Sequence, residues 1–219
     1  MKKLIALLFI ATMIIPVMAQ KSSVSKAADE SSDIIKLPAP NQKGGMPLYE
    51  TFLNRRTDRT FAPKELTDQQ LSDLLWCANG INRADGKRTA PSARNAQEID
   101  IYVFSAGGIF LYIPEKNVLE RIAKEDRREE MSGQSKMIME APITLLFFAN
   151  YEKMDKFSEE AREFYGATDA GFVSQNVYLY CAANKMSTVV MGAIERDPIR
   201  DMIGRDGKAI LAQPVGFAK

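Results

Sequence analysis

Three arginines lie close together in the segment Arg55-Arg56-Thr57-Asp58-Arg59. A guanidinium group presents paired N–H donors that match the oxygens of a phosphate, and the hydroxyl of Thr57 could complete the contacts. The segment is therefore a candidate anion site, although its composition does not identify the anion. Composition alone fits a solvated basic loop equally well.

Two further segments have the composition of a main chain that contacts a ligand. Residues 88–97 are polar and turn-rich, and their small side chains would let a flat ligand approach the backbone. Ser92, Asn95 and Gln97 could hydrogen-bond ring heteroatoms or a ribityl chain. Residues 189–192 predict a strand that ends at a glycine, which suits backbone contact with a ligand or a simple bend. By themselves, both patterns are more often structural than functional.

The chain contains no histidine. This absence excludes Ser-His-Asp and Cys-His nucleophilic sites and every histidine metal site, so hydrolytic functions are disfavoured. Cys77 and Cys181 are the only cysteines, and each lies in an apolar helical pattern. This placement favours two buried thiols over a disulfide, although an oxidising location would permit the disulfide.

The order and spacing of these segments resemble the nitroreductase-like flavoproteins over residues 46–219. The arginine segment is similar to the family's Arg-x-Ser-x-Arg/Lys motif, and Arg56 fills the variable position beside the implied phosphate contacts of Arg55, Thr57 and Arg59. The loop is similar to the family's Pro-Ser-x-x-Asn-x-Gln segment, which usually meets the flavin of the other subunit. That similarity implies flavin contacts from Pro91, Ser92, Ala93, Asn95 and Gln97.

The C-terminal third of the chain extends the resemblance. Val190, Met191 and Gly192 match the strand that faces the isoalloxazine ring, which implies that backbone N–H groups at Met191 and Gly192 are partners of flavin N5. Residues 169–184 are similar to the long, buried central helix of the family's dimer interface. Many relatives continue to a further Lys/Arg pair on the phosphate, a role that falls here to Lys219 alone.

The resemblance implies an FMN-dependent oxidoreductase that works as a homodimer, with FMN at the subunit interface. A hydride would pass from a reduced donor such as NAD(P)H to FMN, and then to a nitroaromatic, quinone or similar small-molecule acceptor. The flavin carries the chemistry, so no catalytic side chain is expected. Residues 108–119 are more similar to the compact branch with the thiazole- and oxazole-forming peptide dehydrogenases. A peptide-azoline dehydrogenase and a non-catalytic flavin-binding protein are the alternatives.

The hydrophobic pattern predicts an α+β fold with a mainly antiparallel central sheet flanked by helices. A capping box that begins at Thr67, followed by leucines at helical spacing, predicts a helix that ends at Asn79-Gly80. We expect other helices at 47–54, 117–130, 169–184 and near 197–203. We expect strands at 99–104, 109–113, 143–149, 188–191 and 209–217.

The N-terminus has the form of a signal peptide. Lys2 and Lys3 precede an apolar run too short for a span of about 20 residues, and small side chains lead to Ala19. We expect cleavage near Ala19 and an exported, periplasmic protein that no longer engages the membrane. Residues 20–45 are expected to be a flexible leader, and residues 46–219 one FMN-binding domain.

Charge and location restrict the partners. Without Lys2 and Lys3 the chain has 27 basic and 28 acidic side chains, a net charge of −1, which provides no electrostatic footprint for nucleic acid. Export would also separate the protein from the cytoplasmic NAD(P)H pool. An exported flavoenzyme of this kind would therefore need an unconventional donor.

Overall fold

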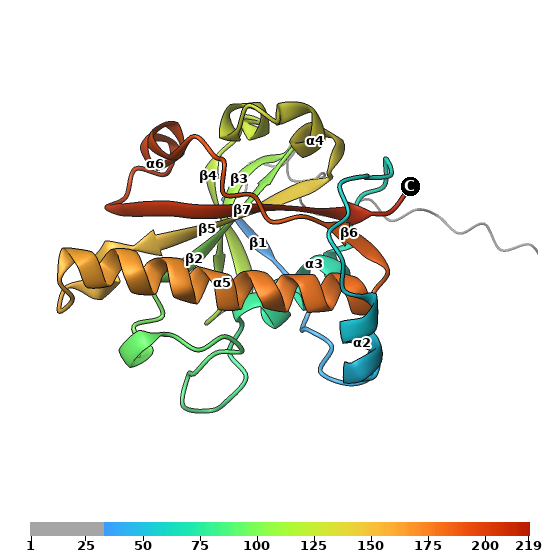
Figure 1. Cartoon of the computed structure of the whole chain (residues 1–219), viewed down its shortest axis with the longest axis horizontal. Helices are drawn as coiled ribbons and strands as arrows, with labels where there is room; N and C mark the ends of the chain where they lie inside the picture. Colours follow the sequence, from blue (N-terminus) through green and yellow to red (C-terminus); the bar gives the residue numbers. More distant parts are fainter. Residues whose placement is uncertain (1–32) are drawn as a thin grey trace, which may run out of the picture.

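One antiparallel sheet organises the computed structural model, which describes residues 33–219 (Figure 1). Its strands follow the order β1-β4-β3-β2-β5-β7-β6. They are β1 (Ile34–Lys36), β2 (Ile99–Ser105), β3 (Gly108–Ile113), β4 (Val118–Ala123), β5 (Ile143–Asn150), β6 (Met186–Thr188) and β7 (Gly207–Phe217). The helices are α2 (Leu48–Asn54), α3 (Asp68–Asn79), α4 (Ser135–Glu140), α5 (Glu159–Ala183) and α6 (Arg196–Ile203). The short 3-10 helices are η2 (Ala93–Asn95), η3 (Arg128–Met131) and η4 (Tyr151–Met154). This is the α+β fold that the sequence predicts.

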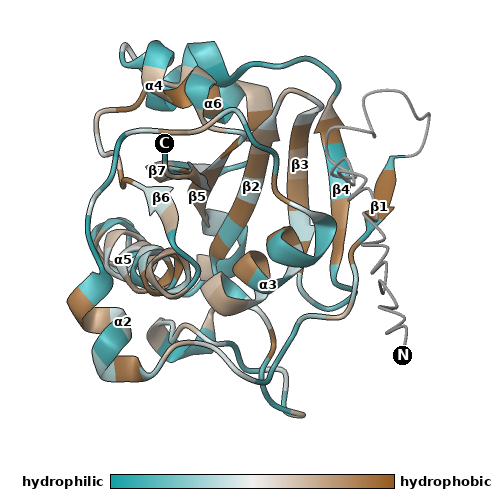
Figure 2. Cartoon of the chain, turned by 90° about the vertical axis from the view of Figure 1, so that its right-hand side faces the viewer, coloured by the Kyte–Doolittle hydropathy of each residue, from teal (hydrophilic) through white to brown (hydrophobic). Residues whose placement is uncertain are grey.

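Helices cover both faces of the sheet. Figure 2 shows α2, α3 and α5 on one side and α4 and α6 on the other. Successive strand residues point to opposite faces, so Ile101 and Val103 pack with α3 and α5, whereas Tyr102 and Phe104 pack with α4 and α6. Two-sided burial explains why β2 and β5 are buried along their whole length and why residues 143–149 form a continuous apolar run.

The two long helices begin at well-formed N-caps. In α3, Thr67 accepts a hydrogen bond from the Gln70 N–H, and the Gln70 side chain accepts one from the Thr67 N–H, as the capping box predicts. Helix α5 begins at Glu159, ten residues earlier than the sequence pattern predicts, because the Ser158 hydroxyl caps a charged first turn that apolar periodicity does not reveal. Its length of 25 residues carries it across the sheet.

The prediction of a helix over residues 117–130 is wrong. Residues Val118–Ala123 instead form β4, which pairs with β3 through partners such as Leu119 and Tyr112. Glu120 is exposed and Arg121 is half-buried, because this strand lies next to the edge of the sheet, where charged side chains reach water. Charged side chains in this strand therefore obscured the alternation of apolar and polar residues that would have indicated a strand.

The leader expected over residues 20–45 contains part of the domain instead. β1 pairs with β4 at the edge of the sheet, and the carbonyl of Pro38 accepts hydrogen bonds from Ser72 Oγ (2.6 Å) and Asn117 Nδ2 (2.7 Å). Side chains on distant elements thus hold a segment whose own composition is unremarkable. The expected signal peptide and residues 20–32 lie outside the described residues. Within residues 33–219, no helix combines the length and the hydropathy needed to cross a bilayer.

The remaining expectations are confirmed with small shifts. Helix α2 follows Pro47, β2 and β3 form the hairpin, and α6 and β7 occupy the expected C-terminal positions. The strand expected at 188–191 lies earlier in the chain, because β6 spans Met186–Thr188 and, beyond it, Met191 forms an isolated bridge with Ala212 of β7. Cys181 is buried, Cys77 is half-buried, and both are free thiols.

Candidate functional site

The arginine segment is extended, so its side chains alternate between two sides. Arg55 ends α2 in an extended conformation, and the Asp58 N–H donates to the carbonyl of Thr188 at the end of β6 (3.0 Å). Arg55 and Thr57 face α5, whereas Arg56 and Asp58 face a separate hollow. Three arginines adjacent in sequence are therefore not one cluster in space.

The hydroxyl of Tyr178 on α5 joins Thr57 to the end of the sheet. It accepts a hydrogen bond from the Val190 N–H (2.9 Å) and lies 3.1 Å from Thr57 Oγ1. The Arg55 guanidinium carbon lies 5.4 Å from the centre of the Tyr178 ring, within the range of a cation–π contact. The structure thus brings together Arg55, Thr57 and Val190, which the sequence selected from distant segments. We call these three residues and Tyr178 the Tyr178 cluster.

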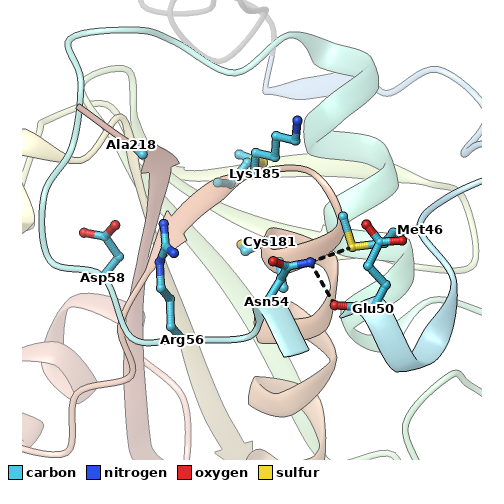
Figure 3. Close-up of a pocket in the computed structure, with 10 residues that line it drawn as sticks. Met46, Glu50, Asn54, Arg56, Asp58, Cys181, Lys185 and Ala218 are labelled. Carbon is cyan, nitrogen blue, oxygen red and sulfur yellow. Dashed lines mark hydrogen bonds between the residues drawn. The ribbon is translucent and has the colours of Figure 1, made fainter. Parts of the chain in front are cut away.

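Arg56 points into a hollow of about 360 Å³ beside the C-terminal end of α5 (Figure 3). Figure 3 shows Arg56 and Asp58 on one side of this hollow, Lys185 above it, and Glu50 across from them on α2. Two cations and two carboxylates line the same space, so the hollow has no net preference for an anion. The geometry separates Arg56 from the side on which Thr57 meets Tyr178.

Asp58 is a structural residue of this segment. Its Oδ1 accepts hydrogen bonds from the Thr60 hydroxyl (2.7 Å) and the Thr60 N–H (3.0 Å), which hold the pKa of the carboxyl below its usual value. The carboxylate therefore stays charged and fixes the turn that follows Thr57. A fixed turn keeps Arg55 and Thr57 in place before any ligand binds.

Residues 190–192, which were expected to face a flavin ring, also alternate between two sides. The Met191 side chain is buried in the core beneath α4 and α6, and its N–H donates to the carbonyl of Ala212 (2.7 Å). The expectation that the Met191 N–H is a partner of flavin N5 is therefore wrong, since pairing with β7 uses it. Gly192 is exposed, and a Cβ there would meet only Leu211 Cδ2 at 3.9 Å, so the backbone is open to a ligand.

Arg59 and Lys219 lie near α4. Arg59 borders a hollow of about 330 Å³ that Glu140 also lines, and Lys219 Nζ donates to Glu140 Oε2 (3.0 Å). That hydrogen bond lowers the pKa of Glu140. In a single chain both cations therefore lie beside a carboxylate of α4, apart from Tyr178.

The loop at residues 91–97 is held in an unusual backbone conformation. Arg94, Asn95 and Gln97 have φ angles of 53°, 56° and 52°, a left-handed region that costs non-glycine residues about 1 kcal/mol or more each. The Ser92 hydroxyl accepts from the Gln97 N–H (2.9 Å), and Asp169 on α5 accepts from the Ala93 N–H (2.8 Å). These contacts compensate for the backbone strain, while Pro91 and Asn95 remain exposed.

Gln97 is already engaged within its own chain. Its Oε1 accepts from Arg88 Nε (3.0 Å), and its Nε2 donates to the carbonyl of Gly86 (3.1 Å). Arg88 is buried and also pairs with Glu115 (3.0 Å). The Gln97 side chain therefore supports the loop, and Asn95 is the most exposed of the polar side chains expected at a flavin.

Within one chain, the loop and the Tyr178 cluster lie at different positions along α5. The loop is anchored at Asp169, and Tyr178 follows nine residues later, which corresponds to about 14 Å along the helix axis. In Figure 1 the green turn η2 lies toward the N-terminal half of α5, whereas α2 and β6 lie at its other end. The structure of one chain therefore keeps these two groups of residues apart.

Known proteins have similar sequences and the same fold. The model of the Nitroreductase family matches residues 53–217, and the chain belongs to this family. It is 31% identical over 178 residues to a nitroreductase-family protein of Methanocaldococcus jannaschii, which covers 77% of this chain and 90% of that protein.

Solved structures agree. A nitroreductase-family protein of Ralstonia eutropha JMP134 superposes with a TM-score of 0.81 at 37% identity, over 86% of this chain and 91% of that one. A protein of Staphylococcus epidermidis described as an NAD(P)H:FMN oxidoreductase shares the fold, with a TM-score of 0.61 at 16% identity, over 82% and 91% of the two chains. The chain is therefore an oxidoreductase of the nitroreductase family.

Sequence reasoning missed Tyr178 as a site residue. It assigned Tyr178 to the apolar face of a helix, where most aromatic side chains serve only packing. The one available signal was chemical, because a tyrosine on a buried helix face needs a hydrogen-bond partner for its hydroxyl. The partners, Thr57 and Val190, lie far from Tyr178 in sequence, so their contact follows only from the fold.

Replacing Tyr178 with phenylalanine tests whether this hydroxyl holds the cluster together. We expect Y178F to lower the free energy of unfolding by about 1 kcal/mol, because the Val190 N–H loses its acceptor. Urea denaturation measures the difference. Y49F, at a tyrosine that is 85% exposed, is the matched control and should leave stability unchanged. Equal stability of the two variants would show that the hydroxyl makes no net contribution.

Proposed function

We propose that this protein is an FMN-dependent oxidoreductase that transfers two electrons, as a hydride, from a reduced donor such as NAD(P)H to a nitroaromatic, quinone or similar acceptor. The observation that carries the proposal is the Tyr178 cluster. It places a guanidinium group, an accessible hydroxyl and the start of an exposed glycine segment on one side of the chain. These are the groups that a phosphorylated, flat cofactor requires.

The phosphate end of FMN fits Arg55 and Thr57. The Arg55 guanidinium supplies paired donors, and Thr57 is exposed, with its hydroxyl held near Tyr178. Because the cation–π contact and the hydrogen bond already order both side chains, little rotamer entropy remains to be lost on binding. Arg56 faces the other side, and we assign it no phosphate contact.

The ring end of FMN fits the backbone after β6. Val190 is half-buried with its N–H turned toward Tyr178, and Gly192 is exposed and has room in front of it. A flat aromatic system can lie against such a backbone, where a larger side chain would hold it away. The buried Met191 side chain anchors this wall from behind, because it packs into the core and pairs with Ala212.

FMN, when bound, supplies the hydride chemistry, and the residues of the chain bind and orient it. Nitro and quinone acceptors can take their protons from water, so a site without histidine is sufficient. Arg55 and Thr57 would fix the position of the ring through the phosphate. The open backbone at Gly192 would define the face on which donor and acceptor stack in turn.

We further propose that the protein acts as a homodimer, with FMN between the subunits. One face of α5 is exposed and apolar, with Phe172 45% and Phe164 64% exposed, and α2 exposes Leu53 (87%) and Phe52 (52%). Large exposed apolar side chains such as these mark an interaction surface. A second copy packed on α5 would bring its loop 91–97 toward the Tyr178 cluster, which a single chain does not do.

The N-terminal sequence supports a proposed location outside the cytoplasm. Export with cleavage near Ala19 would place the domain in the periplasm. In that compartment a reduced quinone or another protein would be a more accessible donor than NAD(P)H. The choice of donor therefore depends on export, whereas the proposed flavin site does not.

The alternation of the arginine segment gives a direct test of the flavin site. We expect R55A to raise the Kd for FMN about 10- to 100-fold, since charge-assisted hydrogen bonds contribute about 1.5–3 kcal/mol. R56A removes the same charge from the neighbouring position, on the side that faces away, and should change the Kd less than about threefold. Flavin fluorescence titration measures both constants. An equal loss in the two variants would contradict the assignment.

The dimer proposal predicts the effect of a charge on α5. F172E should shift the protein from dimer to monomer in light scattering, because an interface would bury the new carboxylate without a partner. FMN affinity should fall with it, since each site needs both copies. M139E places the same charge at a methionine on α4 that is 41% exposed, and it should remain a dimer. A wild-type monomer that binds FMN tightly would exclude the shared site.

A further inference from the structure

A buried carboxyl group lies directly beside loop 91–97. Glu98 follows the loop and precedes β2, and none of its surface is exposed. No hydrogen-bond donor reaches either of its side-chain oxygens. A buried carboxylate without donors would cost several kcal/mol, so the charge state of Glu98 requires an explanation.

The neighbour of this group is a second carboxyl. Asp169 on α5 is 3% exposed, anchors the same loop at Ala93, and is the carboxyl group that acts on the pKa of Glu98. Two carboxylates only accept hydrogen bonds, so their contact becomes favourable when one of them carries a proton. Burial, and then the neighbouring Asp169, raise the pKa of Glu98 to about 8, so a proton on Glu98 is favoured at neutral pH.

Other charges near the pair do not neutralise it. Lys153 of η4 is the cation that faces Glu98, and its ammonium group forms a 2.6 Å ion pair with Asp100 of β2. Asn150 at the end of β5 donates to the other oxygen of Asp100 (3.0 Å). The lysine is thus shared with another buried carboxylate, and the proton remains the main source of neutrality for Glu98 and Asp169.

The pair bears directly on the loop through Asp169. Its Oδ2 accepts the hydrogen bond from the Ala93 N–H (2.8 Å), at the start of the turn that contains the left-handed residues Arg94 and Asn95. A hydrogen bond from protonated Glu98 would fix the Asp169 carboxylate from one side while Ala93 holds it from the other. The strained turn depends on that carboxylate for its attachment to α5.

We propose that Glu98 is a protonated positioning residue, which donates a hydrogen bond to Asp169 and thereby holds loop 91–97 in its ligand-contacting shape. Its effect on flavin binding rests on the proposed function, whereas its effect on the loop does not. Loss of the proton places two negative charges in contact within the protein and releases the loop from α5. The attachment of the loop to α5 therefore weakens as the pH rises.

The sign of the pH dependence follows from the direction of the shift. Because the pKa of Glu98 is raised in the folded protein, its contribution to holding the loop against α5 is complete at pH values below its ordinary pKa. This contribution declines as the pH rises and is lost as the pH passes through about 8. Glutamine has nearly the same shape as glutamic acid and keeps a donor for Asp169. E98Q should therefore keep the loop attached to α5 as the pH rises.

Amide hydrogen exchange of the purified full chain without FMN tests the loop directly. After correction for intrinsic exchange rates, protection of residues 92–97 in the wild-type protein should fall by up to about tenfold per pH unit as the pH rises from 6 to 8, since one proton is lost when the loop detaches, and should level off above pH 8. E98Q should show no such fall. E65Q, a matched substitution at an exposed glutamate beside Arg128, should behave as the wild type. Wild-type protection independent of pH would overturn the proposal.

Two further measurements keep the outcome clear. Infrared spectroscopy of the wild-type protein should show a protonated carboxyl band that disappears with a midpoint near pH 8, and its absence at pH 6 would refute the proposal even if E98Q did not fold. FMN titrations should show affinity falling as the pH rises toward 8 in the wild type and not in E98Q. A pH-sensitive loop in a protein that binds no FMN would retain the role of Glu98 and reject the proposed function. If the wild type and E98Q both bound FMN and showed equal loop protection at every pH, the proposed function would be retained and the role of Glu98 rejected.

Discussion

The hydroxyl of Tyr178 connects three parts of the chain that no local interaction would bring together. It lies on the long helix α5, and it contacts Thr57 of the segment after α2 and the backbone of Val190 after β6. Each partner is irregular chain, which is held in place here by one side chain on a rigid element. The proposed phosphate contacts and the proposed ring wall therefore share one support, and a shift of α5 would move both.

Helix α5 has a second role at its other anchoring point. Asp169 holds the strained loop 91–97, about 14 Å along the helix from Tyr178. A cofactor shared between two copies would meet the Tyr178 cluster of one and the loop of the other, so the exposed apolar face of α5 would determine the distance between them. Stability and binding are coupled through this helix, because the residues that position the site also pack in the core.

Much of the fold could be predicted because apolar periodicity and capping are local. The capping box at Thr67, the apolar run of β5 and the hairpin of β2 and β3 were all recognisable. β4 was not, because its charges lie at the edge of the sheet, and β1 was not, because hydrogen bonds from Ser72 and Asn117 hold the chain that follows it. Elements defined by distant partners carry little signal in their own residues.

The candidate site, like the fold, could be predicted only in part from the sequence. Residue types and motif order predicted that Arg55, Thr57 and Val190 belong together, and the structure brings them together around Tyr178. Which side of an extended chain each residue faces depends on its neighbours, so the opposite direction of Arg56 followed only from the structure. The same is true of Tyr178 itself and of the burial of Glu98, whose proposed partner Asp169 lies 71 positions away in the sequence.

The most direct test of the central claim follows the flavin through one catalytic cycle. Purified protein loaded with FMN is reduced without oxygen and then mixed in a stopped-flow instrument with a quinone or a nitroaromatic compound. Flavin absorbance should return at a rate that saturates with acceptor concentration and exceeds the rate of free FMN under the same conditions. Protein that binds no FMN, or bound FMN that reoxidises no faster than free FMN, would contradict the account.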